Sequence, residues 1–414
     1  MSKDNIVILS PGSNTYFKVE SWTKRLHDKN IYIIINKRHE NDYIHNKPCN
    51  VHIFTVAKWD ENEVYKRIQE INKRESIDLI FSYLEEDVIL AAKIRERLNI
   101  EGQSLISAKS FRDKVIMKDI VKAAGYRVPK YFKVIDYEDF EQFAKENKYR
   151  IVLKPTDKAG AEGVFVIRTK DEYEKIREHQ NNIIKNEYMC EEYIPHNIYH
   201  IDGLVINNKV KYIFVWEYLK NCINFKNEKR GSTISKTVMA GTDTYDKLQN
   251  YARKVIEEFD TPDNYLFHLE VFYDGKEIVF CEIASRMGGG RIIQCIENEF
   301  GFNPIEELLV AECDPNRIII KDNLMFTDEY AFILCGVEEG RVKTIPSKLP
   351  FDEVFDYYTF ATENKEYRAP ETVAQNVAAI CVKSYKGKEL RNKVIEIDNW
   401  YKEHCTFEKG KNYE

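Results

Sequence analysis

Two glutamates on neighbouring predicted strands constrain this chain more than any other feature of its sequence. Apolar runs flank Asp274-Gly275, a pair typical of a tight turn, so residues 268–284 are predicted to form a β-hairpin. Glu270 lies in the first strand and Glu282 in the second, and charges within apolar strands are rarely buried unless they are paired or bind a metal ion. Because Mg²⁺ prefers carboxylate oxygens and is usually completed by substrate phosphates, two facing glutamates suit a nucleotide-bound Mg²⁺.

The alternation of side chains along a strand limits which hairpins bring these carboxylates together. A two-residue loop pairs Glu270 with Val279 and turns Glu282 to the opposite face. A three-residue loop centred on Gly275 pairs Glu270 with Phe280 and leaves both glutamates on one face, about 7–8 Å apart at Cα. The metal interpretation therefore predicts an odd-length turn or a bulge. The alternative is a hairpin whose glutamates are solvated on an exposed face.

The composition is that of a soluble globular protein. Its 414 residues suffice for about two to four domains, and 43% of them are hydrophobic and 31% charged. The net charge is −6 and no basic stripe stands out, which argues against a nucleic-acid partner. No apolar run approaches the length of a membrane span, and Met1-Ser2-Lys3-Asp4 leads into a predicted strand and not into a signal peptide. The nine cysteines contain no Cys-x-x-Cys pair, so reduced thiols and a cytoplasmic location are expected. Because no apolar run is long enough to span a membrane, no membrane partner is expected.

Apolar runs and helical patterns alternate along the chain and predict an α/β protein. Ile6–Leu9, Ile31–Ile35 and Asp78–Ser82 are strand-like, and a helical pattern follows at Val88–Leu98. Residues 1–107 are therefore predicted to form an α/β domain with a parallel sheet. The other predicted units are a linker helix (110–124) with a compact α+β lid within 108–189, a strand-rich unit that holds the hairpin at 190–320, and an α+β unit at 321–414.

A loop of small residues follows a strand that ends in a lysine. The strand Ile151–Pro155 contains Lys154, and the loop after it contains Gly160 and Gly163. Such a loop can place backbone N–H groups and a point charge over phosphates. It differs from a Walker P-loop, because Gly-Lys-Ser/Thr is missing and a strand follows. The alternative is an ordinary hairpin with a surface lysine.

Two other segments are candidates for ligand binding. The strand Cys190–Pro195 enters a turn and can present backbone groups to an adenine edge, although a plain edge strand explains it as well. Arg286 and Arg291 flank Gly288-Gly289-Gly290, a flexible stretch suited to close approach to a ligand and to bidentate recognition of a carboxylate or phosphate. His200 and His268 are more typical of structural than of catalytic histidines.

Taken in order, these segments resemble the motifs of ATP-grasp enzymes. They are most similar to the carboxylate–amine (L-amino-acid) ligase branch, which is related to biotin carboxylase and D-alanine–D-alanine ligase. The resemblance covers residues 1–320 and implies an N-terminal parallel-sheet α/β domain, a small α+β lid and a larger mixed-sheet C-terminal domain. It rests on Arg112-Asp113-Lys114 with Met117-Lys118, on Leu153-Lys154-Pro155, on Glu191-Glu192-Tyr193-Ile194, and on Glu270, Glu282 and Arg286 with the glycines that follow.

The resemblance implies roles for these residues. Arg286 would contact the γ-phosphate and the acyl phosphate, and together with Lys154 it would be catalytic. Glu270 and Glu282 would hold two Mg²⁺ ions, with Glu282 bridging and Mn²⁺ as the alternative ion. The ATP-binding set would be Lys114, Lys154, Gly160, Gly163, Glu191, Glu192, Tyr193, Ile194 and His200, with adenine met largely through the backbone. The candidates for contact with the carboxylate substrate are Arg230 and Lys236 in the loop 221–237, together with Gly289 and Arg291.

The chain departs from the family pattern at two positions. Ile198 stands near the place of a ribose-binding glutamate, and Ala284 replaces the asparagine expected two residues after the second metal ligand. The function implied is an ATP-dependent ligase that activates a small carboxylate, such as an amino acid, as an acyl phosphate and joins it to an amine. The alternatives are transfer of the acyl group to the thiol of a carrier protein and a non-catalytic ATP-binding regulator. A homodimer is expected from the resemblance.

Overall fold

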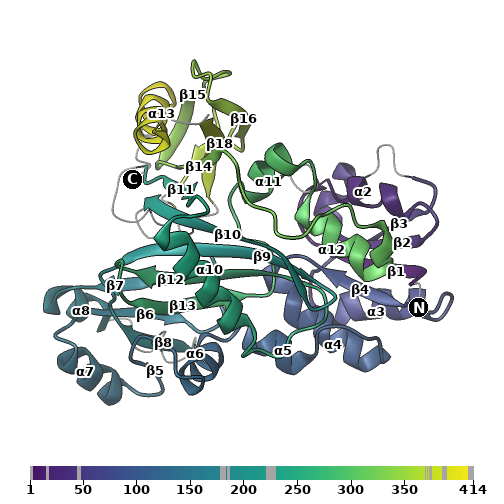
Figure 1. Ribbon diagram of the computed structural model, residues 1–414, viewed down its shortest axis with the longest axis horizontal. Helices are drawn as coiled ribbons and strands as arrows, with labels where there is room; N and C mark the ends of the chain where they lie inside the picture. The colour runs from purple at the N-terminus through teal and green to yellow at the C-terminus, as the bar shows by residue number, and fades with distance from the viewer. Residues whose placement is uncertain are drawn as a thin grey trace, which may run out of the picture.

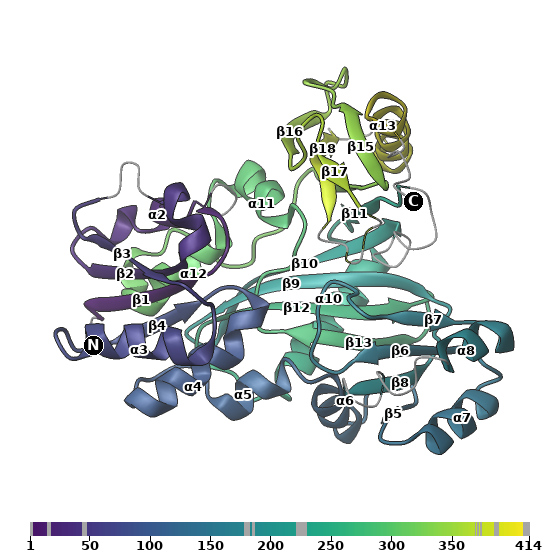
Figure 2. The ribbon, with the colours of Figure 1, turned by 180° about the vertical axis from the view of Figure 1, so that it is seen from behind.

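The computed structural model describes residues 3–14, 18–43, 48–177, 183, 187–220, 230–368, 370, 372, 375–384 and 389–408. An N-terminal α/β layer, a lid and a C-terminal extension surround a long central sheet (Figures 1 and 2). This arrangement confirms the predicted fold class. Within the described residues, no helix combines the length and the apolar character needed to cross a membrane.

The N-terminal layer is a four-stranded parallel sheet in the order β3-β2-β1-β4. The three strands predicted here are present, and β3 adds a fourth that the sequence analysis did not anticipate. One face packs on α3 and α4, where Val7 and Ile34 meet Val64 and Ile94. The elements are β1 (Asn5–Ser10), α2 (Val19–Trp22), β2 (Asn30–Asn36), β3 (Val51–Val56), α3 (Glu61–Asn72), β4 (Leu79–Ser82) and α4 (Val88–Leu98).

The other face of this sheet is covered by a distant part of the chain. Ile8 and Ile33 belong to the same apolar core as Leu309 and Val310 of α12 (Pro304–Cys313). In Figure 1, α12 lies against the N-terminal strands, with α11 (Ile292–Phe300) beside it. The N-terminal layer is therefore completed by residues that follow the carboxylate hairpin, which ties the hairpin to this layer.

Two helices in place of the one predicted lead into the lid. The chain turns at residues 111–113, and the side chain of Asp113 accepts hydrogen bonds from the amides of Val115 and Ile116, which starts a new helix. The lid sheet has the strand order β5-β8-β6-β7. The elements are α5 (Leu105–Ser110), α6 (Lys114–Ala123), β5 (Tyr131–Lys133), α7 (Tyr137–Glu146), β6 (Ile151–Pro155), β7 (Phe165–Ile167), α8 (Lys170–Arg177) and β8 (Tyr188–Glu192).

The central sheet has eight strands in the order β13-β12-β9-β10-β11-β14-β18-β16. This sheet was expected to be mixed, but all of its described strand pairings are antiparallel. α10 covers one face, where Leu248 and Val255 pack on Val205 and Ile213. The elements are β9 (Asn197–Ile206), β10 (Lys209–Lys220), β11 (Thr233–Thr237), α10 (Asp243–Ile256), β12 (Tyr265–Tyr273) and β13 (Ile278–Ala284).

The C-terminal part extends this sheet. β14 pairs with β11, so the sheet continues across residue 320, where a separate unit was predicted to begin. α13 closes this part against β14 and β18 in one apolar core. The elements are β14 (Glu329–Gly336), β15 (Gly340–Thr344), β16 (Val354–Thr359), β17 (Glu366–Tyr367), β18 (Asn376–Ser384), α13 (Leu390–His404) and β19 (Thr406–Glu408).

Candidate functional site

The hairpin β12–β13 brings the two glutamates directly opposite each other. Tyr273 pairs with Ile278, so the loop has four residues, and neither the two-residue nor the three-residue loop considered from the sequence is present. Glu270 pairs with Glu282 because the register shifts at Cys281, an extra residue in β13. A bulge is one of the two devices by which both carboxylates were expected to share a face. The expected pairing of Glu270 with Phe280 is corrected.

Both glutamates face a cavity of about 250 Å³ between the lid and the central sheet. Val152 and Val166 of the lid and Ile198 and Phe272 of the central sheet supply apolar walls. Most of the predicted site residues also line this cavity. These are Lys114, Lys154, Gly160, Glu191, Glu192, Tyr193, Ile194, Glu270, Glu282, Arg286 and Gly289.

A buried carboxylate shared by two lysines forms the lid side of this cavity. Glu191 lies 2.7 Å from the Nζ of Lys154 and 3.2 Å from the Nζ of Lys118. Burial alone would raise the pKa of Glu191, but the charges of the two lysines outweigh it and lower that pKa. The side chain of Glu191 is thus occupied by the lysines. Its backbone pairs with Tyr131 of β5 and Val152 of β6 inside the lid sheet, so the predicted adenine contact is left to residues that follow it.

Lys118 was given no role in the sequence analysis, although its position carried a signal. It lies on the apolar face of α6 with Met117 and Val121, and its side chain is fully buried. Its ammonium also donates a hydrogen bond to the carbonyl of Cys281, the bulged residue. A lysine in an apolar helix stripe needs a buried partner, and this one joins the bulge to the lid.

A second group of charges surrounds Glu282. The Nζ of Lys114 lies 3.6 Å from the Oε2 of Glu282. It also donates a hydrogen bond to the carbonyl of Lys158 in the lid loop. Burial would raise the pKa of Glu282, yet the charges of Lys114 and then Lys154 keep that pKa well below its usual range. Glu282 is therefore ionised at neutral pH. Two opposed carboxylates that line a cavity form a donor set that suits a divalent cation such as Mg²⁺.

Arg286 is held by a residue of the N-terminal layer. Its Nε donates to Glu85 at 2.8 Å, and Arg112 bonds to the same carboxylate. Burial would raise the pKa of Glu85, but Arg286 and Arg112 outweigh burial and lower it. The sequence analysis missed Glu85; the acidic run Glu85-Glu86-Asp87 directly after β4 was the available signal. The contact joins the N-terminal layer, the linker and the glycine-rich stretch beside the cavity.

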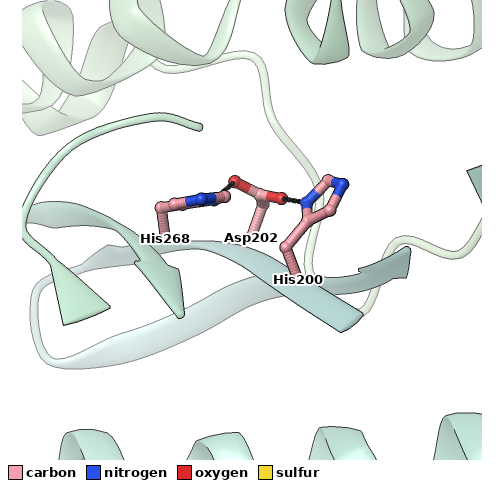
Figure 3. Close-up of side chains that lie close together, drawn as sticks. All are labelled: His200, Asp202 and His268. Atoms are coloured by element: carbon pink, nitrogen blue, oxygen red, sulfur yellow. Dashed lines mark hydrogen bonds and ion pairs between the residues drawn. The ribbon is translucent and has the colours of Figure 1, made fainter. Parts of the chain in front are cut away.

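His200, Asp202 and His268 form a buried network (Figure 3), and Nε2 of His268 lies 3.6 Å from a carboxylate oxygen of Glu270. The two oxygens of Asp202 bind Nδ1 of His200 at 2.7 Å and Nδ1 of His268 at 2.9 Å. Asp202 also accepts the amide of Gly288 at 3.1 Å. Burial would lower the pKa of His268, but the charge of Asp202 and its hydrogen bond raise that pKa to about 9. The three side chains could surround a metal ion, yet each Asp202 oxygen already pairs with an imidazole, so they satisfy one another.

Five predicted residues lie outside the cavity lining. His200 is buried and bonds through Nε2 to Ser235 at 2.7 Å, so it supports the sheet from within. Gly163 lies in the lid loop with a positive φ of 70°. Arg291 pairs with Asp356, which draws it towards β16.

The two candidates in the loop 221–237 are engaged elsewhere. Arg230 donates to the carbonyls of Lys402 and Cys405 and lies 3.0 Å from Glu338. Lys236 lies on the face of β11 opposite to Thr233 and pairs with Glu329 at 3.1 Å. The C-terminal extension thus binds both cations. The segment 221–229, predicted to border the carboxylate site, falls outside the described residues.

The chain is similar in sequence and in fold to several known proteins. Residues 119–291 match the model of the ATP-grasp domain. An L-arginine-specific L-amino acid ligase of Bacillus subtilis is 26% identical over 65% of this chain and 66% of its own length. An alanine–anticapsin ligase of Bacillus subtilis (strain 168) is 24% identical over 70% of this chain and 63% of its own length. The chain thus matches slightly less than two thirds of either relative.

Solved structures extend the likeness to the whole fold. The crystal structure of an L-amino acid ligase from Bacillus licheniformis superposes with a TM-score of 0.76 and 15% identity, covering 99% of this chain and 100% of that one. A carboxyaminoimidazole ribonucleotide synthase from Aspergillus clavatus, solved with ATP, gives a TM-score of 0.69 and 14% identity, covering 96% of this chain and 99% of that one. At these identities the likeness establishes the fold.

Proposed function

We propose that this protein is an ATP-dependent ligase that joins a small carboxylate to an amine, and the match of residues 119–291 to the ATP-grasp domain supports this. The observation that carries the proposal is the convergence of Glu270, Glu282, Lys114, Lys154 and Arg286 on one cavity under a lid. The named relatives, an L-arginine-specific amino acid ligase and an alanine–anticapsin ligase, support an amino acid as the carboxylate.

The nucleotide lies between the lid and the central sheet. Ile194 offers backbone groups to the adenine edge, because the amides of Glu192 and Tyr193 already donate to the carbonyls of Lys130 and Arg150. Val152 and Phe272 offer apolar surface to the ring. Ile198 lines the same cavity at the position where a ribose-binding glutamate was expected. The ribose therefore meets an apolar wall at this position in place of a carboxylate.

Glu270 and Glu282 would hold Mg²⁺, or Mn²⁺, against the phosphates. Bound there, the ion would supply positive charge that neutralises the phosphates. Lys114 and Lys154 add positive charge on the lid side, and Arg286 adds it on the side of the N-terminal layer. Ala284, in place of the expected asparagine, contributes no oxygen ligand from its side chain, so the two glutamates carry the protein's share of the coordination.

The reaction needs no covalent residue. The substrate carboxylate attacks the γ-phosphate, which gives an acyl phosphate and ADP; an amine then attacks the acyl carbon and displaces phosphate to form the amide. Phosphoryl transfer depends on positioning and charge neutralisation, and the side chains at this cavity supply both. The lid loop with Gly160 and Gly163 keeps water from the acyl phosphate.

The test is a phosphate-release screen over amino acids, singly and in pairs, with hydroxylamine as a trap. We expect ATP-dependent hydroxamate with a specific carboxylate, its loss in Glu282→Ala, and its retention in Glu363→Ala, which removes an exposed glutamate of the C-terminal part. Binding of ATP without turnover on any pair would contradict the ligase and favour a regulatory protein.

The acceptor and the assembly state need separate measurements. We expect a free amine, and not the thiol of a pantetheinylated carrier protein, to consume the acyl phosphate; a thioester product would contradict this. A homodimer is expected from the family resemblance, and sedimentation of the full chain checks it.

A further inference from the structure

The cavity continues along the central sheet beyond the metal-binding glutamates. One row of residues crosses the sheet from Phe272 on β12 to Phe332 on β14. Phe272 pairs with Ile198, and Tyr218 follows in the same row because Glu217, the residue before it, pairs with Tyr199. Tyr218 then pairs with Ser235, and Ser235 with Phe332. Four strand spacings of about 4.8 Å separate β12 from β14, so this floor is about 19 Å wide. Phe272, Ile198, Tyr218 and Phe332 all line the cavity, which therefore reaches well past the space between Glu270 and Glu282.

The nucleotide occupies the β13 end of this floor. The amide of Phe280 on β13 donates to the carbonyl of Arg127, which leads into the lid, at 2.9 Å. Lys114 faces Glu282 on the same strand. The lid and the phosphate-binding charges are thus attached at the β13 edge, and the β14 end remains for another ligand.

The β14 end is closed by the glycine-rich stretch. A Cβ built on Gly290 would come within 2.6 Å of the ring of Phe332, so the backbone lies directly on this side chain. Gly289 and Gly290 line the cavity together with Thr233 and Leu334, which pair with each other across β11 and β14. This end is therefore a pocket bounded by the sheet and the backbone of residues 289–290.

The side chains that β10, β11 and β14 contribute to this pocket are uncharged among the described residues. Within the described part of the chain, β10, β11 and β14 contribute Tyr218, Thr233, Phe332 and Leu334 to the cavity lining. The hydroxyl of Tyr218 donates to Glu270 at 3.0 Å, which turns it towards the reaction centre. Three charged residues of these strands have partners outside the lining: Glu217 pairs with Arg391, Lys220 with Asp398, and Lys236 with Glu329.

We propose that the β14 end of the cavity binds the side chain of the carboxylate substrate and selects an uncharged, mainly apolar one. The reacting carboxylate must lie beside Glu270, Glu282 and Arg286 to meet the γ-phosphate, so the rest of the substrate extends away from the nucleotide, over Tyr218 and towards Leu334. An ionised side chain would lose its water there and gain no opposite charge from these walls. This assignment presupposes the proposed ligase activity.

The first test uses the wild-type protein with hydroxylamine as the common acceptor. Hydroxamate formation is compared for apolar (Leu, Met, Phe), cationic (Lys, Arg) and anionic (Asp, Glu) amino acids. We expect kcat/KM for the best apolar amino acid to exceed that of every charged one by at least about tenfold, the lower range for hydrophobic-pocket discrimination. A charged amino acid as the best substrate would overturn the pocket assignment and leave the ligase standing. No hydroxamate from any carboxylate, with ATP bound, would overturn the ligase and the assignment together.

The second test changes the pocket. Leu334→Asp supplies the missing negative charge, and we expect the ratio of kcat/KM for lysine over leucine to rise at least about tenfold. Ile319→Asp introduces the same charge at an exposed isoleucine and should leave the ratio unchanged. If Leu334→Asp fails to fold, as judged by thermal melting and ADP binding, Leu334→Ala replaces it. In that variant we expect the ratio of kcat/KM for the substrate phenylalanine over the substrate alanine to rise at least about threefold. An unchanged ratio in a folded Leu334 variant would overturn the assignment.

Discussion

The carboxylate of Glu191 neutralises two ammonium groups that have almost no access to water, and its removal gives the sharpest stability prediction. The side chains of Lys118 and Lys154 are 0% and 6% exposed, and both lie within 3.2 Å of Glu191. Glu191→Gln keeps the size of the side chain and removes its charge. Removing one partner of a buried ion pair typically costs about 3–5 kcal/mol of unfolding free energy.

An independent limit on this cost follows from proton release. A buried Lys118 without its partner can avoid the cost of a buried charge by losing its proton. At pH 7 this deprotonation costs about 1.36 kcal/mol for each pH unit below the ordinary lysine pKa of 10.5, so the loss of stability for this lysine is at most about 5 kcal/mol. In the variant the folded-state pKa of a buried lysine falls below the unfolded value, so the unfolded chain binds more protons and stability rises with pH. Between pH 7 and pH 9 we therefore expect the destabilisation to shrink, by up to about 2.7 kcal/mol for one lysine.

Urea unfolding followed by tryptophan fluorescence at pH 7 and pH 9 measures both quantities. Glu192→Gln is the neighbouring control, because the partner of Glu192 is the part-exposed Arg127, and its loss should cost less than about 1 kcal/mol. Lys118→Met in the Glu191→Gln background removes one of the two uncompensated charges and should restore part of the lost stability. If Glu191→Gln lowers the unfolding free energy by less than about 1 kcal/mol, or by an amount independent of pH, Glu191 does not neutralise charged Lys118 and Lys154 as proposed.

Three further predictions concern other contacts. Glu85→Gln should lower stability at neutral pH because Arg286 and Arg112 lose their shared carboxylate. The pKa of Glu85 is lowered in the folded state, so the difference in melting temperature between the variant and the wild type should shrink as the pH falls below 4.5. A difference that is constant from pH 7 to pH 4 would contradict this. Gly163→Ala should destabilise the lid by about 1–3 kcal/mol, since φ is +70° and the new Cβ would lie 2.7 Å from the Tyr188 hydroxyl. Gly125→Ala is the control for backbone strain alone, because Gly125 has a φ of +87° and no atom within 4 Å of its Cβ position. Limited proteolysis measures the loss of stability in the lid. Asp202→Asn should cost about 3–5 kcal/mol because two imidazoles lose their shared carboxylate, whereas Ser235→Ala should cost about 1 kcal/mol; equal melting temperatures for the two variants would contradict the network.

Short-range features of the site could be predicted from consecutive residues. The hairpin strands, the strand that carries Lys154 and the small-residue loop after it depend on local alternation and turn chemistry, which act over a few residues. The shared face of Glu270 and Glu282 was predicted to need an odd turn or a bulge. The structure has the bulge at Cys281, whose carbonyl accepts a hydrogen bond from Lys118. Local pattern therefore predicted the strands that carry Lys154, Glu270 and Glu282, although it did not predict β3.

Long-range pairings could not be deduced in this way. The chain has 62 basic and 68 acidic residues, so charge alone cannot select Glu85 as the partner of Arg286, 201 residues away. The same ambiguity made Arg230 and Lys236 attractive as substrate contacts, whereas the C-terminal extension binds both of them. Composition and local order in the sequence determined the strands and the chemical groups of this protein. Only the tertiary structure decided which charges are neutralised and which face the cavity, because that choice depends on which distant segments exclude water from each other.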